Sequence, residues 1–198
     1  MTRTRLPSLS STAGEATRSR SSTSTGQCHA KKVYDVPEGT RTAKGKSVSS
    51  FLRLAEGEKI AAMLCVKDFA PDRFLVMATT RGTIKKTPLE AFEKVRSSGI
   101  RAITLNEKDE LAWVDVSTGR DDVILATALG KIARFAETEV RPMGRDAAGV
   151  IGIRLARQGD QVVSMSVVDP DADLLVLTAT GYGKRVPLTE FNRKHRGG

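Results

Sequence analysis

Short apolar runs alternate with polar turns along most of this sequence, and the runs recur at a regular interval. Three of them, at residues 75–78, 123–126 and 174–177, each lie a few residues before a glycine, namely Gly82, Gly130 or Gly181. A cation stands four residues after each of these glycines. The glycines are 48 and 51 residues apart, and a fixed period near 50 residues indicates an array of similar structural units.

The pattern within each repeat is typical of β-strands. The apolar runs are rich in Val, Ile, Leu and Thr, are too short for helices, and end at glycine turns, which favours β-hairpins. Further strands are expected at residues 100–105 and 111–116, and again at 150–155 and 162–168. About four strands per repeat is the content of one propeller blade. The sequence therefore predicts an all-β, propeller-type array of about three blades, each a four-stranded antiparallel repeat of about 50 residues. At most a short turn is expected over residues 88–95.

The first thirty residues have a different composition. They hold thirteen Ser and Thr, four Arg and one Glu, with very little to bury, and such a segment does not compensate the entropy cost of ordering its backbone. Residues 1–30 are predicted to be a disordered Ser/Thr/Arg-rich tail, either without a role or serving as a basic arm, and residues 31–198 to form the propeller.

The formal net charge of +9 and a pI near 9.8 make a polyanion the first partner to consider. No uncharged apolar run approaches the roughly 18 residues that span a bilayer, so no membrane association is expected. Cys28 and Cys65 are isolated, which suits a reducing cytosol better than a disulfide scaffold. A cytoplasmic, nucleoid-associated location is the expectation.

Charge alternates in register with the repeat. Residues 81–101 hold six cations and two acids, and residues 184–196 hold five cations and one acid. In contrast, residues 106–122 hold six acids and two bases, and residues 158–173 hold four acids and no base. Cationic segments that recur with the blades would form an arc suited to a bent polyanion, with binding that tolerates any base sequence and depends steeply on salt.

Several segments carry a family resemblance. They include residues 32–38 and 41–46, the stretch Gly82-Thr83-Ile84-Lys85-Lys86-Thr87, residues 140–144 and 149–155, and Gly181-Tyr182-Gly183-Lys184-Arg185. Together these resemble the C-terminal domain of the DNA gyrase A protein over residues 31–198. The resemblance implies that the chain is a fragment, of about three blades, of a spiral β-pinwheel whose basic rim DNA wraps around. It also implies a parent enzyme that is an ATP-dependent type II topoisomerase. The partners that it implies are double-stranded DNA, the N-terminal region of gyrase A, and gyrase B.

Two functional features of that family have no match here. Neither Tyr34 nor Tyr182 stands in the context of the DNA-cleaving tyrosine, so no catalytic residue is expected in this chain. The glycine-rich basic box required for wrapping is also incomplete, with Lys44-Gly45-Lys46 and His195-Arg196-Gly197-Gly198 as its nearest approaches. The predicted DNA contacts are Lys31, Lys32, Arg41, Lys44, Lys46, Lys85, Lys86, Lys131, Arg134, Arg145, Lys184, Arg185, Arg193, Lys194 and Arg196.

Cofactor and metal chemistry find little support in the sequence. Gly39 and the Gly45-Lys46-Ser47 stretch have one residue too many between them for a phosphate-binding loop. Asp169, Asp171 and Asp173 lack the glycine and distal glutamate of a calcium loop. No cofactor or metal is expected.

Three alternatives stay open. They are the equivalent domain of topoisomerase IV, a propeller-type protein-interaction scaffold, and a truncated product without function. Salt-sensitive binding to random duplex DNA separates the scaffold from the two topoisomerase interpretations.

Overall fold

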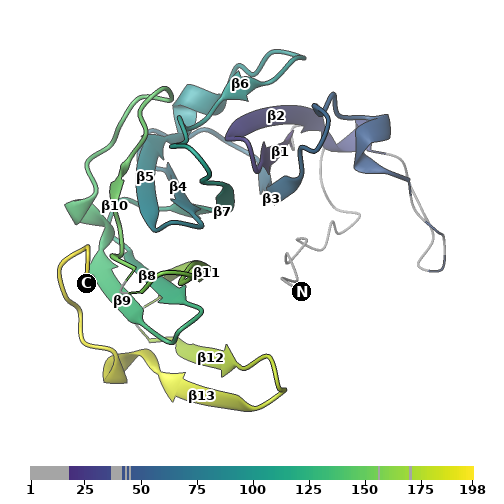
Figure 1. The fold of residues 1–198 in the computed structure, drawn as a ribbon. Helices are drawn as coiled ribbons and strands as arrows, with labels where there is room; N and C mark the ends of the chain where they lie inside the picture. The colour runs from purple at the N-terminus through teal and green to yellow at the C-terminus, as the bar shows by residue number, and fades with distance from the viewer. Residues whose placement is uncertain (1–17, 37–41, 43, 45, 156, 170) are drawn as a thin grey trace.

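Four β-hairpins set out the architecture of the chain (Figure 1). The computed structural model describes residues 18–36, 42, 44, 46–155, 157–169 and 171–198. Within these ranges the chain forms strands and short 3-10 helices and no α-helix, so the all-β prediction is confirmed. The hairpins are β1 (Arg18–Thr23) with β2 (Gln27–Lys32), β4 (Phe74–Thr79) with β5 (Thr83–Pro88), β8 (Asp122–Thr127) with β9 (Ile132–Ala136), and β12 (Asp173–Leu177) with β13 (Gly183–Pro187).

The same turn closes all four hairpins. In each, a threonine accepts a bond at its backbone carbonyl from the amide of a glycine three residues later, and its hydroxyl accepts one from the amide after that glycine. The glycines have φ between 79° and 90°, a conformation that residues with a Cβ rarely adopt. The threonine and glycine pairs are Thr23 and Gly26, Thr79 and Gly82, Thr127 and Gly130, and Thr178 and Gly181. The repeat therefore has a fourth copy, upstream of the three that the apolar pattern reveals.

Strands that follow each hairpin complete the sheets. We number the blades 1 to 4 by their hairpins. Blade 1 has the order β3-β1-β2-β6, blade 2 has β7-β4-β5-β10, blade 3 has β11-β8-β9, and blade 4 is the β12-β13 hairpin alone. The added strands are β3 (Ile60–Val66), β6 (Ile100–Arg101), β7 (Leu111–Ser117), β10 (Val150–Ile151) and β11 (Val162–Val168).

Neighbouring blades exchange strands. β6 follows the hairpin of blade 2 in sequence but pairs with β2 of blade 1, and β10 follows the hairpin of blade 3 but pairs with β5 of blade 2. The four sheets follow one another along an open arc, from the purple blade 1 to the yellow hairpin β12-β13 (Figure 1). The predicted propeller or pinwheel fragment is confirmed, but it has four blades where about three were expected, and blades 3 and 4 have three strands and two strands instead of four. Strand exchange ties blade 2 to blade 1 and blade 3 to blade 2.

The hydrophobic core lies between blades, where it covers both faces of the hairpin strands of blade 2. Along β4, Leu75 and Met77 belong to one buried cluster, whereas Val76 and Ala78 belong to another. Alternate side chains of a strand point to opposite faces, so this strand carries two cores. One core joins blades 1 and 2, and the other joins blades 2 and 3. None of the helical segments in the described ranges has the length and apolarity needed to cross a membrane.

Short 3-10 helices follow the hairpins. These are η1 (Val33–Asp35), η3 (Leu89–Phe92), η4 (Glu137–Glu139) and η5 (Leu188–Glu190), and η2 (Val48–Ser50) lies in the connection between β2 and β3. The expected short turn over residues 88–95 is η3. Since each of η1, η3, η4 and η5 follows the second strand of a hairpin, the four occupy equivalent places in the repeat.

The prediction of a disordered tail through residue 30 is wrong for residues 18–30. β1 is an inner strand of blade 1, with β2 on one side and β3 on the other. Residues 19–23 are buried although all five are polar. Ladder bonds on both sides satisfy the β1 backbone, and the Arg20 guanidinium bonds to two carbonyls, so this strand does not depend on apolar side chains. The rest of the predicted tail, residues 1–17, lies outside the described residues.

Candidate nucleic-acid interface

Lys86 on β5 is buried, and its charge is used inside the protein. Its Nζ donates to the backbone carbonyl of Glu137, the first residue of η4, at 3.0 Å, and lies 3.7 Å from the Glu137 carboxylate. The ammonium also lies 5.1 Å from the centroid of the Phe74 ring. Lys86 therefore holds the 3-10 helix of blade 3 against blade 2. We call this arrangement, in which a hairpin cation holds the 3-10 helix of the next blade, a clamp.

Arg134 forms the next clamp at the equivalent position of β9. Its Nη1 donates to the carbonyls of Leu188 and Phe191, in and after η5, at 2.6 and 3.2 Å. Its Nη2 lies 2.8 Å from the carboxylate of Asp122, which is fully buried. Arg134 thus fastens η5 of blade 4 to blade 3.

Blade 1 makes its clamp from the neighbouring strand. The position equivalent to Lys86 and Arg134 is Ala30, whose partner across the sheet is Arg20 on β1. Arg20 is buried and donates to the carbonyls of Phe92 and Glu93 at 3.0 and 3.1 Å. A cation on β1 therefore replaces the missing cation on β2, and it holds the end of η3.

Lys85 points to the opposite face of β5 from Lys86 and is also buried. Its ammonium donates to the carbonyl of Ala102 at 2.8 Å and to that of Arg145. Burial lowers the pKa of Lys85 to about 8, the nearby Asp146 carboxylate opposes this shift, and Arg145 adds to it. Lys85 ties the segment after β6 to the segment before β10.

The depressed pKa of Lys85 predicts how stability depends on pH. An unfolded lysine has a pKa of about 10.4, so between about pH 8 and 10.4 the unfolded chain binds more protons at this residue than the folded chain does. The contribution of Lys85 to the free energy of unfolding should therefore rise with pH across this window. Urea unfolding of wild type and Lys85→Met from about pH 7 to 10.4 measures it, and the wild type should gain stability relative to the variant. A constant difference would contradict the assignment.

The burial of Lys85, Lys86 and Arg134 argues against the prediction that they contact DNA. The side chains of Lys85 and Lys86 are at most 4% exposed and that of Arg134 is 11% exposed. All three charged groups bond to carbonyls of neighbouring segments. These bonds make the three side chains inter-blade ties.

Other predicted contacts lie in blades 3 and 4 or in the connection between β2 and β3 of blade 1. Lys131 donates to the carbonyls of Arg154 and Gly198, Arg193 lies 2.6 Å from the Asp122 carboxylate, and Arg196 donates to the carbonyl of Ile151. Arg185 lies 3.2 Å from Asp173, with its side chain 77% exposed. Lys44, Lys46, Lys184 and Lys194 are exposed, and Arg41 lies outside the described residues.

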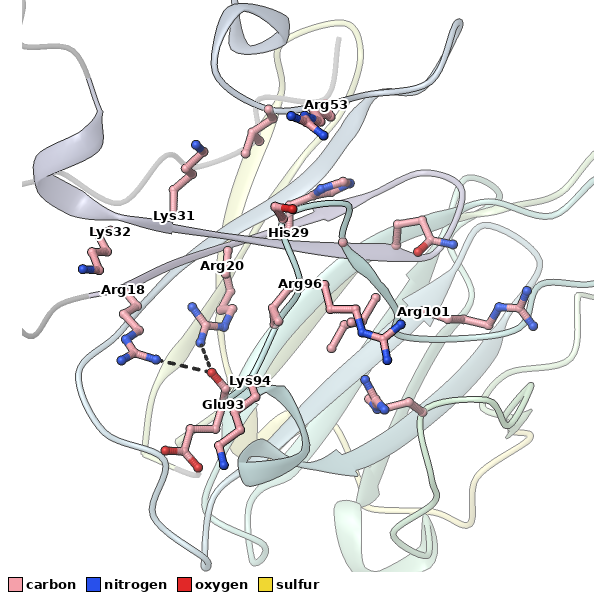
Figure 2. A pocket seen from close by; sticks show the side chains of 18 of the residues that line it. Arg18, Arg20, His29, Lys31, Lys32, Arg53, Glu93, Lys94, Arg96 and Arg101 are labelled. Carbon is pink, nitrogen blue, oxygen red and sulfur yellow. Dashed lines mark hydrogen bonds between the residues drawn. The ribbon is translucent and has the colours of Figure 1, made fainter.

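Positive charge gathers in a groove of about 1210 Å³ where blade 1 meets the loop after η3 (Figure 2). Nine Lys and Arg side chains line it against three carboxylates. The cations are Arg18 and Arg20 on β1, Lys31 and Lys32 on β2, Arg53, Lys94, Arg96, Arg101 on β6, and Arg145. The acids are Asp35, Glu93 and Asp146. Lys31, Lys32 and Arg145 are thus three predicted contacts that the fold brings to one place. We call this site the basic groove.

Two features position the loop that carries Lys94 and Arg96. Arg18 and Arg20 both donate to the carbonyl of Glu93, at 3.4 and 3.1 Å, as the dashed lines in Figure 2 mark. At the other end of the loop, Gly99 has φ of 86°, and a Cβ there would lie 2.8 Å from the His29 ring. The two β1 arginines therefore order the loop, and its exposed cations face solvent.

The equivalent junction between blades 2 and 3 is different. Its pocket, of about 620 Å³, is lined by Thr87, Pro88, Glu90, Ala91, Glu93, Pro142, Met143 and Gly144. This lining includes two glutamates and, within the described part of the chain, no cation. Of these two junctions, the first is therefore lined mainly by cations and the second by acids.

Six groove cations are absent from the contacts predicted from sequence: Arg18, Arg20, Arg53, Lys94, Arg96 and Arg101. The local excess of cations over residues 81–101 was a signal for three of them. Arg18 and Arg20 lay in the segment assigned to the tail, and only the Thr-x-x-Gly turn at residues 23–26 could have placed them in a blade.

Comparisons with known proteins agree with this architecture. The family described as DNA gyrase C-terminal domain, beta-propeller matches residues 32–67, 73–118, 121–169 and 172–198. The DNA gyrase A protein of Klebsiella oxytoca is 44% identical over 173 residues, which is 87% of this chain and 20% of that protein. The DNA gyrase A protein of Chlamydia pneumoniae is 43% identical over 178 residues, 89% of this chain and 21% of that protein. This chain spans about a fifth of the length of these curated relatives.

Two solved structures share the fold. The C-terminal domain of DNA topoisomerase IV superposes with a TM-score of 0.83 and 27% identity, covering 92% of this chain and 57% of that one. A DNA gyrase A C-terminal domain superposes with a TM-score of 0.77 and 24% identity, covering 92% of this chain and 58% of that one. Both likenesses extend over most of this chain.

Proposed function

Because this chain belongs to the DNA gyrase C-terminal domain family, we propose that it binds duplex DNA through phosphate contacts, without reading base sequence, and bends it. The basic groove is the observation that carries the proposal. Cations spaced along a groove neutralise successive phosphates and release counterions, which gives affinity without base specificity. Any preference among sequences would then come from how easily each duplex bends.

The arc of blades gives the reason for bending. Lys184 and Lys194 in and after blade 4 are exposed, and a duplex seated in the basic groove reaches them only by following the arc. The basic groove at blade 1 carries more cations than Lys184 and Lys194 supply near blade 4. The groove would therefore bind DNA more strongly, and these two lysines would make weaker contacts. The acidic pocket between blades 2 and 3 would repel phosphates, so the DNA would not contact the protein at that junction.

The family membership supports a role within a larger enzyme. Gyrase A is part of a type II topoisomerase, and in that setting this module would bind and bend the DNA segment that the enzyme passes. Its neighbours there would be the N-terminal region of gyrase A, and gyrase B, in the cytoplasm. The chain would contribute DNA binding and no strand cleavage. Tyr34 lies beside Lys32, with the ammonium 5.2 Å from its ring centroid, and Tyr182 lies in the turn of blade 4.

The likeness to the topoisomerase IV domain supports a second candidate. The same groove would then serve an enzyme that relaxes or unlinks DNA, with the same binding chemistry. Fusing the chain to a gyrase A protein that lacks its own C-terminal domain distinguishes the two. Recovery of negative supercoiling favours gyrase, and ATP-dependent relaxation alone favours topoisomerase IV.

Binding to two unrelated duplexes of about 40 base pairs over a salt series tests the proposal. The account predicts equal affinities within about threefold, and a steep linear fall of log affinity with log salt concentration. Fluorescence anisotropy measures both. Undetectable or salt-insensitive binding would contradict the proposal that this chain binds DNA, and would favour a protein-interaction scaffold.

A further inference from the structure

Lys85 is a buried cation without an ion-pair partner. Its side chain is fully buried, and among the described residues no carboxylate lies within ion-pair distance of its ammonium. The neighbouring Lys86, in contrast, lies 3.7 Å from the Glu137 carboxylate. Buried charges are normally paired, because an unpaired charge loses its hydration without compensation. Lys85 therefore lacks the compensating anion that Lys86 has.

The ammonium of Lys85 lies behind the wall of the basic groove. It donates to the carbonyl of Ala102 at 2.8 Å and to that of Arg145 at 2.5 Å. Arg145 lines the groove, and Ala102 directly follows Arg101, another lining residue that Figure 2 labels. Lys85 thus holds the two segments that present Arg101 and Arg145 to the groove. A phosphate bound by these arginines would also be attracted by the charge behind them.

The surroundings of this ammonium leave it close to titration. Burial lowers the pKa of Lys85 to about 8, the Asp146 carboxylate opposes this shift, and the Arg145 guanidinium adds to it. Across the sheet, β4 places the uncharged Met77 opposite Lys85. Blade 1 contributes Cys28 to the core on this face, and burial raises the pKa of its thiol to about 11. Near pH 8, an added anion would therefore change the protonation of Lys85.

We propose that Lys85 is a positioning residue of the basic groove, and that it holds a proton when DNA phosphates bind beside Arg101 and Arg145. This inference rests on the proposed function. Bound phosphate supplies the anion that Lys85 lacks and favours its charged form. Above about pH 8 the free chain has lost this proton, so DNA binding takes one up from the buffer. Affinity is then constant below about pH 8 and falls as the pH rises above it.

Proton uptake on binding tests this coupling in the unaltered chain. Isothermal titration calorimetry with a random duplex of about 40 base pairs, at about pH 8.5 in two buffers of different ionisation enthalpy, should show uptake of about half a proton per bound chain. Between about pH 7 and 9.5 the affinity should fall by about tenfold, as expected when the complex holds one proton that the free chain loses.

Two substitutions identify the group that takes up the proton. Lys85→Arg stays charged throughout this pH range, so it should bind as wild type does at pH 7 and lose the proton uptake. Lys85→Met removes the charge, so it should bind about tenfold more weakly at pH 7 and also lose the uptake. A lysine with a purely structural role would leave the pH profile of DNA binding unchanged when replaced. Thermal unfolding checks that each variant is folded, and the uptake by wild type decides if one is not.

The outcomes separate this inference from the proposed function. Salt-sensitive DNA binding by wild type without proton uptake would overturn the role of Lys85 and leave DNA binding in place. Equal uptake by wild type and a folded Lys85→Met variant would do the same, because another group would then hold the proton. Absence of DNA binding at pH 7 would overturn both.

Discussion

Arg134→Ala is expected to lower the free energy of unfolding by about 3 kcal/mol, whereas Arg185→Ala at the equivalent position should lower it by less than about 1 kcal/mol. Removing Arg134 leaves the fully buried Asp122 carboxylate with Arg193 alone, whose side chain is 55% exposed. It also deprives the Leu188 and Phe191 carbonyls of their donor. The Arg185 pair, in contrast, is largely in water, where ion pairs contribute little.

Urea unfolding of the two variants at one pH and low protein concentration makes the comparison. The two substitutions are chemically identical and occupy the same place in the repeat, so the difference between them isolates the effect of a filled clamp. A similar loss in both variants would show that burial of the clamp does not determine stability. A stable Arg134→Ala variant with greatly weakened DNA binding would restore Arg134 as a phosphate contact.

The fold was predictable wherever strands are apolar. The runs that precede Gly82, Gly130 and Gly181 become β4, β8 and β12, and the period of about 50 residues corresponds to one blade. The apolar pattern does not reveal the first copy because β1 has the sequence Arg-Ser-Arg-Ser-Ser-Thr. A strand with ladder bonds on both sides is satisfied through its backbone, and apolar periodicity does not detect it. Its Thr-x-x-Gly turn is the signal that the sequence offered.

The candidate DNA contacts were less predictable, because the position of a Lys or Arg in the sequence does not show whether a neighbouring blade buries its side chain. Lys85 and Lys86 point to opposite faces of β5, and in an open sheet one of them would reach solvent. In this array a neighbouring blade covers each face, so both are buried. Cations in loops are not covered in this way, and Lys94 and Arg96 are exposed in the basic groove. The contrast between strand cations and loop cations therefore separates structural ties from candidate DNA contacts.

Replacing four groove cations together should have the largest effect on DNA binding. In a Lys31→Ala, Lys94→Ala, Arg96→Ala, Arg101→Ala variant, each lost phosphate contact removes about 0.9 from the slope of log affinity against log salt concentration, or about 3.6 in all. Extrapolated from 1 M to about 0.1 M salt, this corresponds to roughly a four-thousandfold loss of affinity. Arg18 and Arg20 remain in place, so the loop after η3 keeps its support.

The salt slope of this groove variant tests the central claim most directly. The matched control replaces four exposed cations outside the groove, Lys59, Lys67, Lys108 and Arg120, and so removes the same net charge. On one random duplex from about 0.05 to 0.3 M salt, the account predicts a slope about 3.6 shallower for the groove variant and close to wild type for the control. Equal slopes in the two variants would mean that net charge alone attracts DNA, and would contradict a binding site in the basic groove.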